Sequence, residues 1–177
     1  MQIYMDTYIQ FDIREWKISD LDSLVMYGIN PNISKFMSDA FPDSKEKWDK
    51  FLTQVTSNKS LHYRAIDIEG MAVGGIGISP HQGEKRCNAE LGYWLSETYW
   101  NKGIITATVK LMLSLAFETY PELNRIYATP YGTNTASHKV LTKTGFTLEA
   151  RFEKIILKNN ELLDECVYAY RKDKYTL

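Results

Sequence analysis

A glycine turn at the start of an amphipathic stretch is the first feature of this sequence that can carry chemistry. The turn comprises Asn101, Lys102, Gly103, Ile104, Ile105 and Thr106. A helix that begins at such a turn presents unpaired backbone N–H groups and the positive end of its dipole, which suit a phosphate or pyrophosphate. One glycine before a helix is more often only a sharp turn, so both interpretations stay open at this point.

A second polar group stands at the start of a later predicted helix. Asn134 is a suitable N-cap, because its side-chain oxygen can accept a hydrogen bond from the first turn. Ser137 is then a polar residue of that turn, and Lys139 and Lys143 lie four residues apart on one helix face. From residue type alone, this pattern indicates a capped helix with a solvated basic side.

The cysteines and histidines do not point to metal chemistry. Cys87 and Cys166 lack metal-ligand spacing, and His62, His81 and His138 form neither an HExxH-like nor a triad-like group. Isolated cysteines are typical of small hydrophobic thiols in a reducing compartment. We therefore expect a cytoplasmic protein without a metal ion.

The composition of the whole chain excludes several classes. The 177 residues suit one domain over 1–177, with 44% hydrophobic and 24% charged residues. A net charge of −1 without a basic stripe argues against nucleic acid as a partner. Because the apolar runs are far shorter than a bilayer and the N-terminus lacks the pattern of a secretory signal, we expect no membrane partner.

The first part of the chain predicts one strand, two helices and a long connection between them. Residues 8–16 alternate and are rich in aromatic and β-branched residues, which indicates a strand. A short helix follows around residues 21–25, and Ser44 is a suitable N-cap for the second helix. The connection over 30–44 is either a short helix packed on the core or a substrate lid.

The rest of the chain alternates strands with helices. Strands are predicted over 61–68, 71–79, 87–95, 125–129, 147–157 and 162–171, and helices over 103–119 and 136–143. The Glu-Gly pair at 69–70 and the Asn-Asn pair at 159–160 suit tight turns, so each closes an antiparallel hairpin. Gly74, Gly75 and Gly77 indicate a bulge or the close approach of another segment. The mixture predicts one α/β domain with a mixed sheet.

Residues 134–146 carry the most specific pattern in the chain. They read Asn-Thr-Ala-Ser-His-Lys-Val-Leu-Thr-Lys-Thr-Gly-Phe. This run resembles the N-x-x-S-x-x-V-L-x-K-x-G-F helix of the RimJ/RimL group of GNAT acyl-CoA-dependent N-acetyltransferases, which acetylate N-terminal amines of ribosomal proteins. Residues 90–95 and 99–104 are similar to the strand and pyrophosphate loop of that group, in the same order. The resemblance implies a twisted, mixed, largely antiparallel sheet of about seven strands flanked by four helices.

The loop departs from the pattern of the superfamily. That pattern usually begins with Gln or Arg and has Gly two residues before the central glycine and Gly or Ala two residues after it. This chain has Trp100, then Asn101 before Lys102, and Ile105 at the last place. A side chain as large as Ile105 fits beside phosphates only if the contacts are made by backbone N–H groups and the side chain turns inward.

The resemblance also implies the cofactor-binding residues. Acetyl-CoA is the implied co-substrate, with its pyrophosphate on the turn over 101–106 and its pantetheine arm along the strand edge at Trp94 and Leu95. That strand is expected to splay away from residues 126–129, and Asn134 is expected to orient the cofactor. Lys139 and Lys143 are the candidates for a CoA phosphate.

The implied reaction is direct attack of a primary amine on the thioester in a ternary complex. Ser137 is the implied proton donor to the leaving thiolate, and Glu90 is the candidate base, acting through water. The implied acceptor is a protein N-terminal amine or a small-molecule amine.

Three alternatives stay open. A polyamine or antibiotic-amine acetyltransferase would have acidic residues in the acceptor cleft beside the 30–44 connection. A noncatalytic acyl-CoA-binding sensor would bind the cofactor without turnover. An interaction domain would expose the aromatic residues of the 93–100 region, namely Tyr93, Trp94, Tyr99 and Trp100. The protein is expected to be a monomer or a homodimer.

Overall fold

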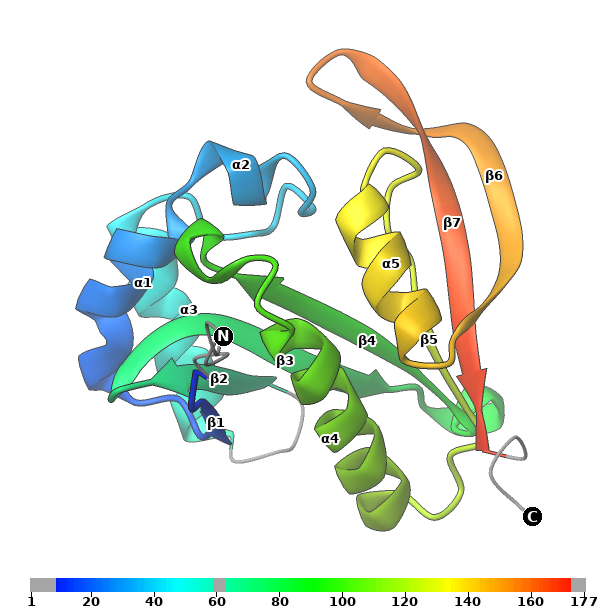
Figure 1. The fold of residues 1–177 in the computed structure, drawn as a ribbon, viewed down its shortest axis with the longest axis horizontal. Coiled ribbons are helices and arrows are strands. Elements are labelled where there is room, and N and C mark those ends of the chain that lie inside the picture. The colour runs from blue at the N-terminus through cyan, green and yellow to red at the C-terminus, as the bar shows by residue number, and fades with distance from the viewer. Residues whose placement is uncertain (1–8, 59–62, 173–177) are drawn as a thin grey trace, which may run out of the picture.

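A computed structural model, which describes residues 9–58 and 63–172, folds seven strands into one sheet (Figure 1). The strands are β1 (Asp12–Arg14), β2 (Tyr63–Ile68), β3 (Met71–Pro80), β4 (Asn88–Leu95), β5 (Arg125–Ala128), β6 (Thr147–Lys158) and β7 (Glu161–Arg171). Their order is β1-β2-β3-β4-β5-β7-β6, in which β4 and β5 run parallel and the other neighbours run antiparallel. The predicted mixed, largely antiparallel sheet is confirmed.

The described residues form five α-helices, one more than expected. They are α1 (Leu21–Gly28), α2 (Pro31–Ser34), α3 (Lys45–Ser57), α4 (Ile104–Thr119) and α5 (Thr135–Lys143), with short 3₁₀ turns η1 (Ile18–Asp20), η2 (Gly83–Lys85) and η3 (Glu97–Tyr99). The additional helix, α2, lies in the 30–44 connection. Asn30 caps it by accepting a hydrogen bond from the Asn32 N–H at 2.8 Å, and Pro31 fills the first helical position.

Two hairpins are confirmed and one strand is shorter than predicted. Both residues of each tight turn, at 69–70 and at 159–160, have positive φ. The strand predicted over 8–16 is reduced to β1, since only 12–14 pair with β2. Trp16 leaves the sheet and packs in the core, where it is 6% exposed. Residues 8, 61 and 62 of the predicted strands lie outside the described residues.

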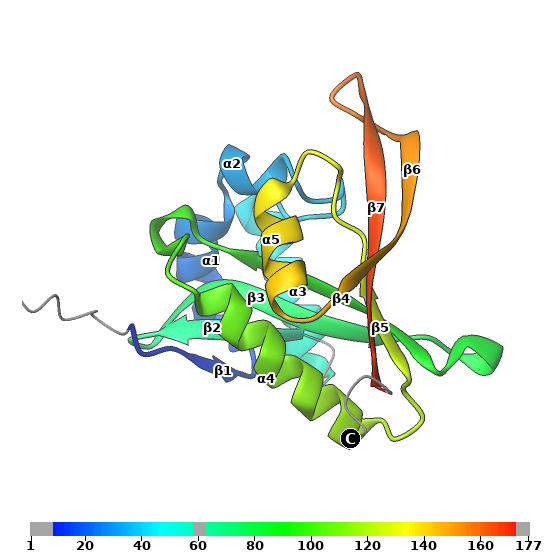
Figure 2. The ribbon, with the colours of Figure 1, turned by 45° about the vertical axis from the view of Figure 1, so that its right-hand side comes forward.

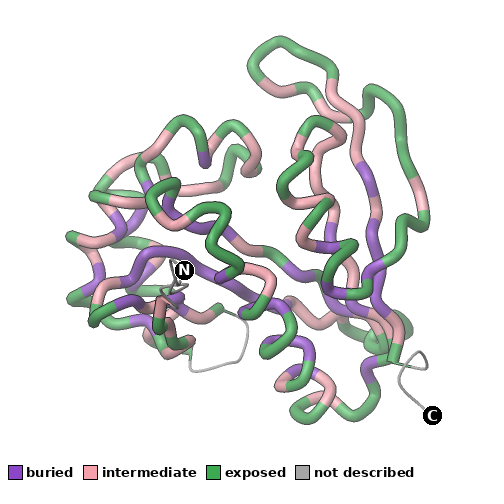
Figure 3. Tube along the Cα trace, viewed as in Figure 1, coloured by how far each residue is buried: buried purple, intermediate pink, exposed green. Residues whose placement is uncertain are grey.

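Two apolar clusters lie between the sheet and its helices, one on each face. Figure 2 shows how the helices lie against the sheet, and Figure 3 shows which segments are buried. Helices α4 and α5 pack on one face through residues that include Val109, Met112 and Leu141. Helices α1 and α3 contribute to the other cluster, which also includes Trp94 of β4. Because successive strand residues point to opposite faces, Trp94 and its neighbour Leu95 belong to different clusters.

The glycines of β3 make room for the neighbouring strand. A Cβ atom at Gly74 would lie 2.6 Å from the carbonyl oxygen of Trp94, and one at Gly75 would lie 2.8 Å from the Trp94 indole. The predicted close approach is therefore confirmed for Gly74 and Gly75, and the approaching segment is β4.

The β6–β7 hairpin bends at a bulge. The register shifts between Phe152 and Ile156, and Lys154 has a φ of 55°. The Asp164 side chain fixes this bend by accepting a hydrogen bond from the Lys154 N–H at 3.0 Å. The far end of the hairpin therefore leans back over α5 toward the segment between α2 and α3 (Figure 1).

Candidate active site

Strands β4 and β5 separate after three paired residues. Residues 88–90 of β4 pair with 125–127 of β5, whereas β4 continues to Leu95 beside β3 alone. The predicted splay is thus confirmed. A cavity of about 1020 Å³ lies at this opening, lined by residues of both strands just beyond the last pair.

The cavity reaches both faces of the sheet. Tyr93, Asn134 and Ser137 line it on the side of α5, whereas Glu90 and Glu165 line it on the opposite side. Glu90 and Tyr93 stand an odd number of residues apart on one strand, so their side chains leave opposite faces. The splay therefore connects two groups of polar residues that a closed sheet would separate.

The floor of the cavity is bare backbone. Gly77 of β3 and Gly92 of β4 are direct cross-strand partners, and both line the cavity. A Cβ atom at Gly92 would meet no atom within 4 Å, so packing does not require glycine there. The missing side chains leave room for a ligand beside the sheet.

Two hydroxyl groups meet on the α5 side. The Tyr93 Oη and Ser137 Oγ atoms lie 2.7 Å apart, and the Ser137 N–H donates to the Asn134 side chain at 3.2 Å. Asn134 caps α5, as predicted. Burial raises the pKa of Tyr93 to about 12, against an opposing effect of its hydrogen bond with Ser137, so the phenol stays protonated near neutrality. A proton-carrying hydroxyl pair therefore lines the cavity.

A carboxylate lies on the opposite side of the splay. Glu90 is exposed to the cavity, and the Thr129 hydroxyl donates to it at 3.3 Å. Glu165 of β7 lines the same cavity, although sequence reasoning did not find it. Burial, and then the nearby charge of Glu90, raise the pKa of Glu165. Two carboxyl groups therefore line the cavity. The segment between α2 and α3 lines the same cavity, through residues 36–38 and 40–42.

The N-terminus of α4 is free to receive an anion. Gly103 precedes the helix with a φ of 78°, and no side chain among the described residues caps it. The first hydrogen bond of the helix runs from the Ala107 N–H to the Gly103 carbonyl, which leaves the preceding N–H groups without helical partners. Ile105 packs against the core, so its side chain turns inward as the phosphate hypothesis requires. These residues fit the pyrophosphate of a CoA molecule.

Other predicted cofactor residues lie around this turn. The Trp94 side chain is in the core, so only its backbone can serve the splayed edge. The Leu95 carbonyl already accepts a hydrogen bond from the Trp100 indole at 2.8 Å, which fixes the loop to β4. The ammonium group of Lys102 stands over the Tyr99 ring at 5.3 Å from its centroid. Asn101 adopts a φ of 60°.

Lys139 and Lys143 lie on the exposed side of α5 and do not line the cavity. No ion pair or side-chain hydrogen bond holds either ammonium group within the described part of the chain. Their role toward a CoA phosphate stays a prediction.

The aromatic residues of the 93–100 region do not form an exposed surface. Trp94 is buried, Tyr93 and Tyr99 pack partly buried against the core, and Trp100 is 36% exposed. The interaction-domain hypothesis therefore loses its basis. Across residues 9–58 and 63–172, no three His, Cys, Asp or Glu side chains gather as a metal-binding group, and no helix is long and apolar enough to cross a membrane.

The residues that sequence reasoning missed come from separate elements. Gly92 and Tyr93 lie inside the 90–95 motif, but the motif does not show which face of the sheet each residue points to. That depends on the alternation of side chains along β4. Glu165 lies on β7, far from the other site residues in the sequence. The alternating pattern of β7 puts Glu165 and Cys166 on opposite faces of the sheet. Glu165 reaches the β4–β5 splay because β7 pairs with β5 and because Glu165 forms a bridge with Tyr131 just beyond β5.

Comparison with known proteins defines the class as acetyltransferases. The chain belongs to the GNAT family, since the family described as "Acetyltransferase (GNAT) domain" matches residues 10–147. It is therefore an acetyl-transfer enzyme. A relative from Bacillus subtilis (strain 168), the uncharacterized N-acetyltransferase YnaD, is 27% identical over 168 residues, covering 92% of this chain and 94% of the relative.

Solved structures share the fold. A GNAT acetyltransferase from Bacillus anthracis is 26% identical with a TM-score of 0.81, and the match covers 93% of this chain and 96% of that one. RimJ of Mycobacterium smegmatis, solved in complex with CoA-disulfide, is 20% identical with a TM-score of 0.76, covering 94% of this chain and 84% of that one. Structures of the RimJ/RimL group are thus among those that share the fold of this chain.

Proposed function

We propose that this protein transfers the acetyl group of acetyl-CoA to a primary amine, either a protein N-terminal α-amine or a small-molecule amine, within a ternary complex. The observation that carries the proposal is the cavity through the β4–β5 splay, which has a hydroxyl pair on one side and a carboxylate on the other. Such a passage lets a thioester and an amine approach each other from opposite faces of the sheet.

The α5 side suits the cofactor. The uncapped N-terminus of α4, with Asn101 to Thr106 around it, would hold the pyrophosphate through backbone N–H groups. The edge of β4 that β5 leaves unpaired would hold the pantetheine arm. Asn134 would orient the cofactor, and Lys139 and Lys143 would meet a terminal phosphate. The RimJ structure with a bound CoA disulfide supports this choice of cofactor.

The chemistry then needs two proton movements. Acetyl-CoA supplies an acetyl thioester, which is held next to the acceptor. Glu90 takes a proton from the acceptor ammonium through water, because an α-amine with a pKa of about 8 is mostly protonated near neutrality. The free amine forms the new C–N bond and the C–S bond breaks. Ser137 gives a proton to the leaving sulfur and regains one, through water, from the new amide nitrogen. Tyr93, whose phenol stays protonated, would orient the Ser137 hydroxyl through their hydrogen bond.

The polyamine and antibiotic-amine alternative gains support from the acidic lining. Glu90 and Glu165 line the cavity together with the 36–42 segment, which is where that alternative expects acidic residues. We therefore keep small-molecule amines beside protein N-termini as acceptors.

The test is the release of free thiol from acetyl-CoA in the presence of N-terminal peptides, polyamines, aromatic amines and aminoglycosides. We expect release with one class of acceptor and a reduced rate in Ser137→Ala and Glu90→Gln. Tight binding of acetyl-CoA without release for any acceptor would contradict the proposal and would favour the noncatalytic sensor.

A further inference from the structure

Glu165 is a carboxylate without a partner in the wall of the cavity. Its backbone forms a bridge with Tyr131, and its side chain is partly buried. No hydrogen bond or ion pair to its carboxylate is present within residues 9–58 and 63–172. A carboxylate in such a position is costly unless a ligand supplies a cation or a donor.

Glu90 adds a second negative charge to the same place. The pKa of Tyr127 on β5 is raised first by burial and next by Glu90, and Glu165 contributes to the shift as well. Tyr127 is the cross-strand partner of Glu90, and Glu90 and Glu165 line the same cavity, so the three residues lie on the same face of β4, β5 and β7. Like charges that share a cavity repel each other, and a cation placed between them removes that repulsion.

Lys47 and Lys50 also line the cavity, but no cationic side chain in the described part of the chain forms an ion pair with Glu165. Arg125 stacks over the Tyr127 ring but pairs with Glu149 at 2.6 Å. Lys158 donates to the Met37 carbonyl at 2.7 Å and to Asp39 at 3.0 Å. Neither is therefore available to neutralise Glu165.

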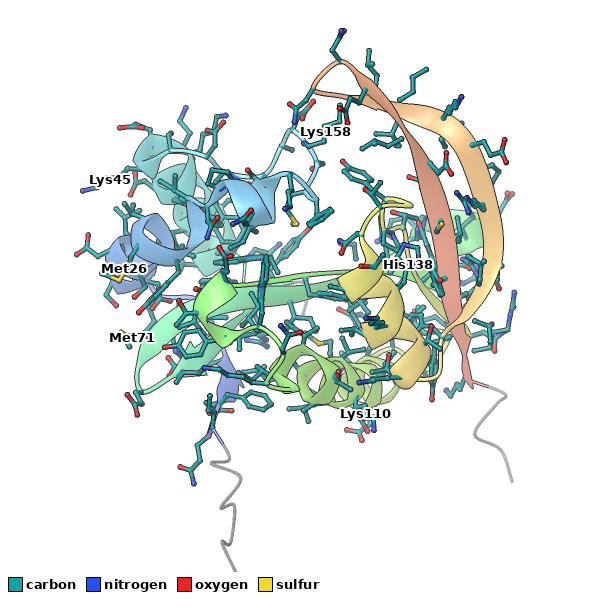
Figure 4. All side chains as sticks on the ribbon, turned by 45° about the horizontal axis from the view of Figure 1, so that its top comes forward. Met26, Lys45, Met71, Lys110, His138 and Lys158 are labelled. Atoms are coloured by element: carbon teal, nitrogen blue, oxygen red, sulfur yellow. The ribbon has the colours of Figure 1, made fainter. Side chains whose placement is uncertain are left out.

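Much of the remaining cavity wall is apolar, and its acceptor side is partly covered. Its walls include Phe36, Met37, Phe41, Phe51 and Ile156, and its floor is the pair of glycines. Lys158 of β6 reaches the segment between α2 and α3, as Figure 4 shows. The Tyr131 hydroxyl donates to the same Met37 carbonyl at 3.2 Å. These contacts partly cover the acceptor side of the cavity, which suits a small molecule better than a folded protein.

We propose that the acceptor is a small hydrophobic primary amine, whose ammonium group binds between Glu90 and Glu165 and whose apolar body lies against the aromatic wall. Glu165 is the specificity residue, because it also repels an acceptor with a carboxylate beside its amine. This inference rests on the proposed acetyl transfer and names the class of its acceptor. An amino acid places a carboxylate where Glu90 and Glu165 already stand, so it is disfavoured.

The experiment compares three acceptors with one aromatic body: phenethylamine, L-phenylalaninamide and L-phenylalanine. We expect kcat/KM for phenethylamine to exceed that for L-phenylalanine by about 100-fold, since a like charge placed beside buried charges costs several kcal/mol. L-Phenylalaninamide, which lacks the carboxylate, should resemble phenethylamine. In Glu165→Gln, KM for phenethylamine should rise about tenfold, while KM for acetyl-CoA stays unchanged. The ratio of kcat/KM for phenethylamine to that for L-phenylalanine should become smaller.

Two further variants keep the test decisive. Glu165→Asp keeps the charge and should keep the preference, and Glu161→Gln, on the same strand but outside the cavity, should change nothing. Equal use of L-phenylalanine and phenethylamine, or equal losses for both in Glu165→Gln, would overturn the inference. Thiol release with peptides or polyamines alone would also overturn it and leave the proposed function standing. If none of the amines gave thiol release, both the inference and the proposed function would be overturned.

Discussion

At the scale of single residues, the hydroxyl pair of Ser137 and Tyr93 decides how the leaving thiolate receives its proton. Replacing Ser137 with Ala removes the hydroxyl that is hydrogen-bonded to Tyr93 and that is proposed to protonate the leaving sulfur. We expect Ser137→Ala to lower kcat about 100-fold, the size of a typical general-acid effect, with little change in KM for acetyl-CoA.

The control for this substitution is Thr135→Ala, in the same helical turn. Thr135 is exposed and does not line the cavity, so kcat should stay within about twofold of wild type. A Ser137→Ala enzyme with wild-type kcat would refute the role of Ser137 as proton donor.

Glu165 also gives a prediction about stability and pH. Its folded pKa is raised above the unfolded value of about 4.3, so the folded state binds the proton more tightly. Stability is therefore lost as the pH rises through the window from the unfolded to the folded pKa. Glu165→Gln should raise Tm at pH 7 by roughly 1 to 2 °C, and the gain should vanish below about pH 4.

Thermal unfolding of the ligand-free protein at pH 4 and pH 7 measures this difference. A Tm of Glu165→Gln below that of wild type at both pH values would contradict this prediction, because it would show that the Glu165 carboxylate stabilises the ligand-free fold. Glu161→Gln, which changes an exposed carboxylate on the same strand, is the matched control.

The residues of the site differ in how far the sequence could predict them. Asn134 and Ser137 follow from a local rule, since an N-cap and the first turn lie within three residues of each other. Ile105 turns inward because α4 is amphipathic, which is also a local property. Glu165 depends on the pairing of β7 with β5, and its approach to Glu90 has no local signal.

At the scale of elements, Arg14 ties the first strand to its neighbours. Its guanidinium donates to Asp20 through two bonds of 2.8 Å and to Asp67 at 2.6 Å. Asp20 is only 4% exposed, so removal of the arginine leaves a buried carboxylate without its partner.

We expect Arg14→Ala to cost about 3 kcal/mol of unfolding free energy, which lowers Tm by roughly 6 to 12 °C. Arg14→Lys should recover only part of this loss, because lysine cannot form the paired bonds of a guanidinium. A Tm change below 1 °C in Arg14→Ala, measured by circular dichroism, would show that these ion pairs contribute nothing.

The elements themselves follow from the sequence with two exceptions. Both hairpins were predictable, because Glu-Gly and Asn-Asn turns accept positive φ at both positions. The shortness of β1 was not predictable, since Trp16 has a strand-like neighbourhood but packs in the core beside Phe51. The 30–44 connection contains the helix α2, which was one of two open alternatives, and its later residues also line the cavity, as the lid alternative expects.

At the scale of the whole molecule, Lys158 connects the C-terminal hairpin to the segment between α2 and α3. Its side chain is 9% exposed, whereas its partner Asp39 is 91% exposed, so the bond to the Met37 carbonyl is the sheltered contact. The bend of the hairpin at Lys154 brings Lys158 to this position, and no local pattern in the sequence predicts a contact between segments so far apart.

We expect Lys158→Met to raise KM for the acceptor about threefold or more, because ordering a freed loop on binding costs roughly 1 kcal/mol. KM for acetyl-CoA, which we propose to bind on the other face of the sheet, should stay the same. Asp39→Asn is the control: it removes an exposed ion pair but keeps the bond to Met37, so its effect should be small. An unchanged acceptor KM in Lys158→Met would argue against a roofed acceptor site.

In the proposed reaction, thioester and amine meet in one cavity and react directly. Initial rates of thiol release, measured while acetyl-CoA and the preferred amine are both varied, test this most directly. Direct attack in a ternary complex predicts double-reciprocal lines that intersect, and enzyme recovered without acceptor should carry no acetyl group. Parallel lines together with an acetylated enzyme would contradict the claim, since they would require the protein to carry the acetyl group between two separate steps.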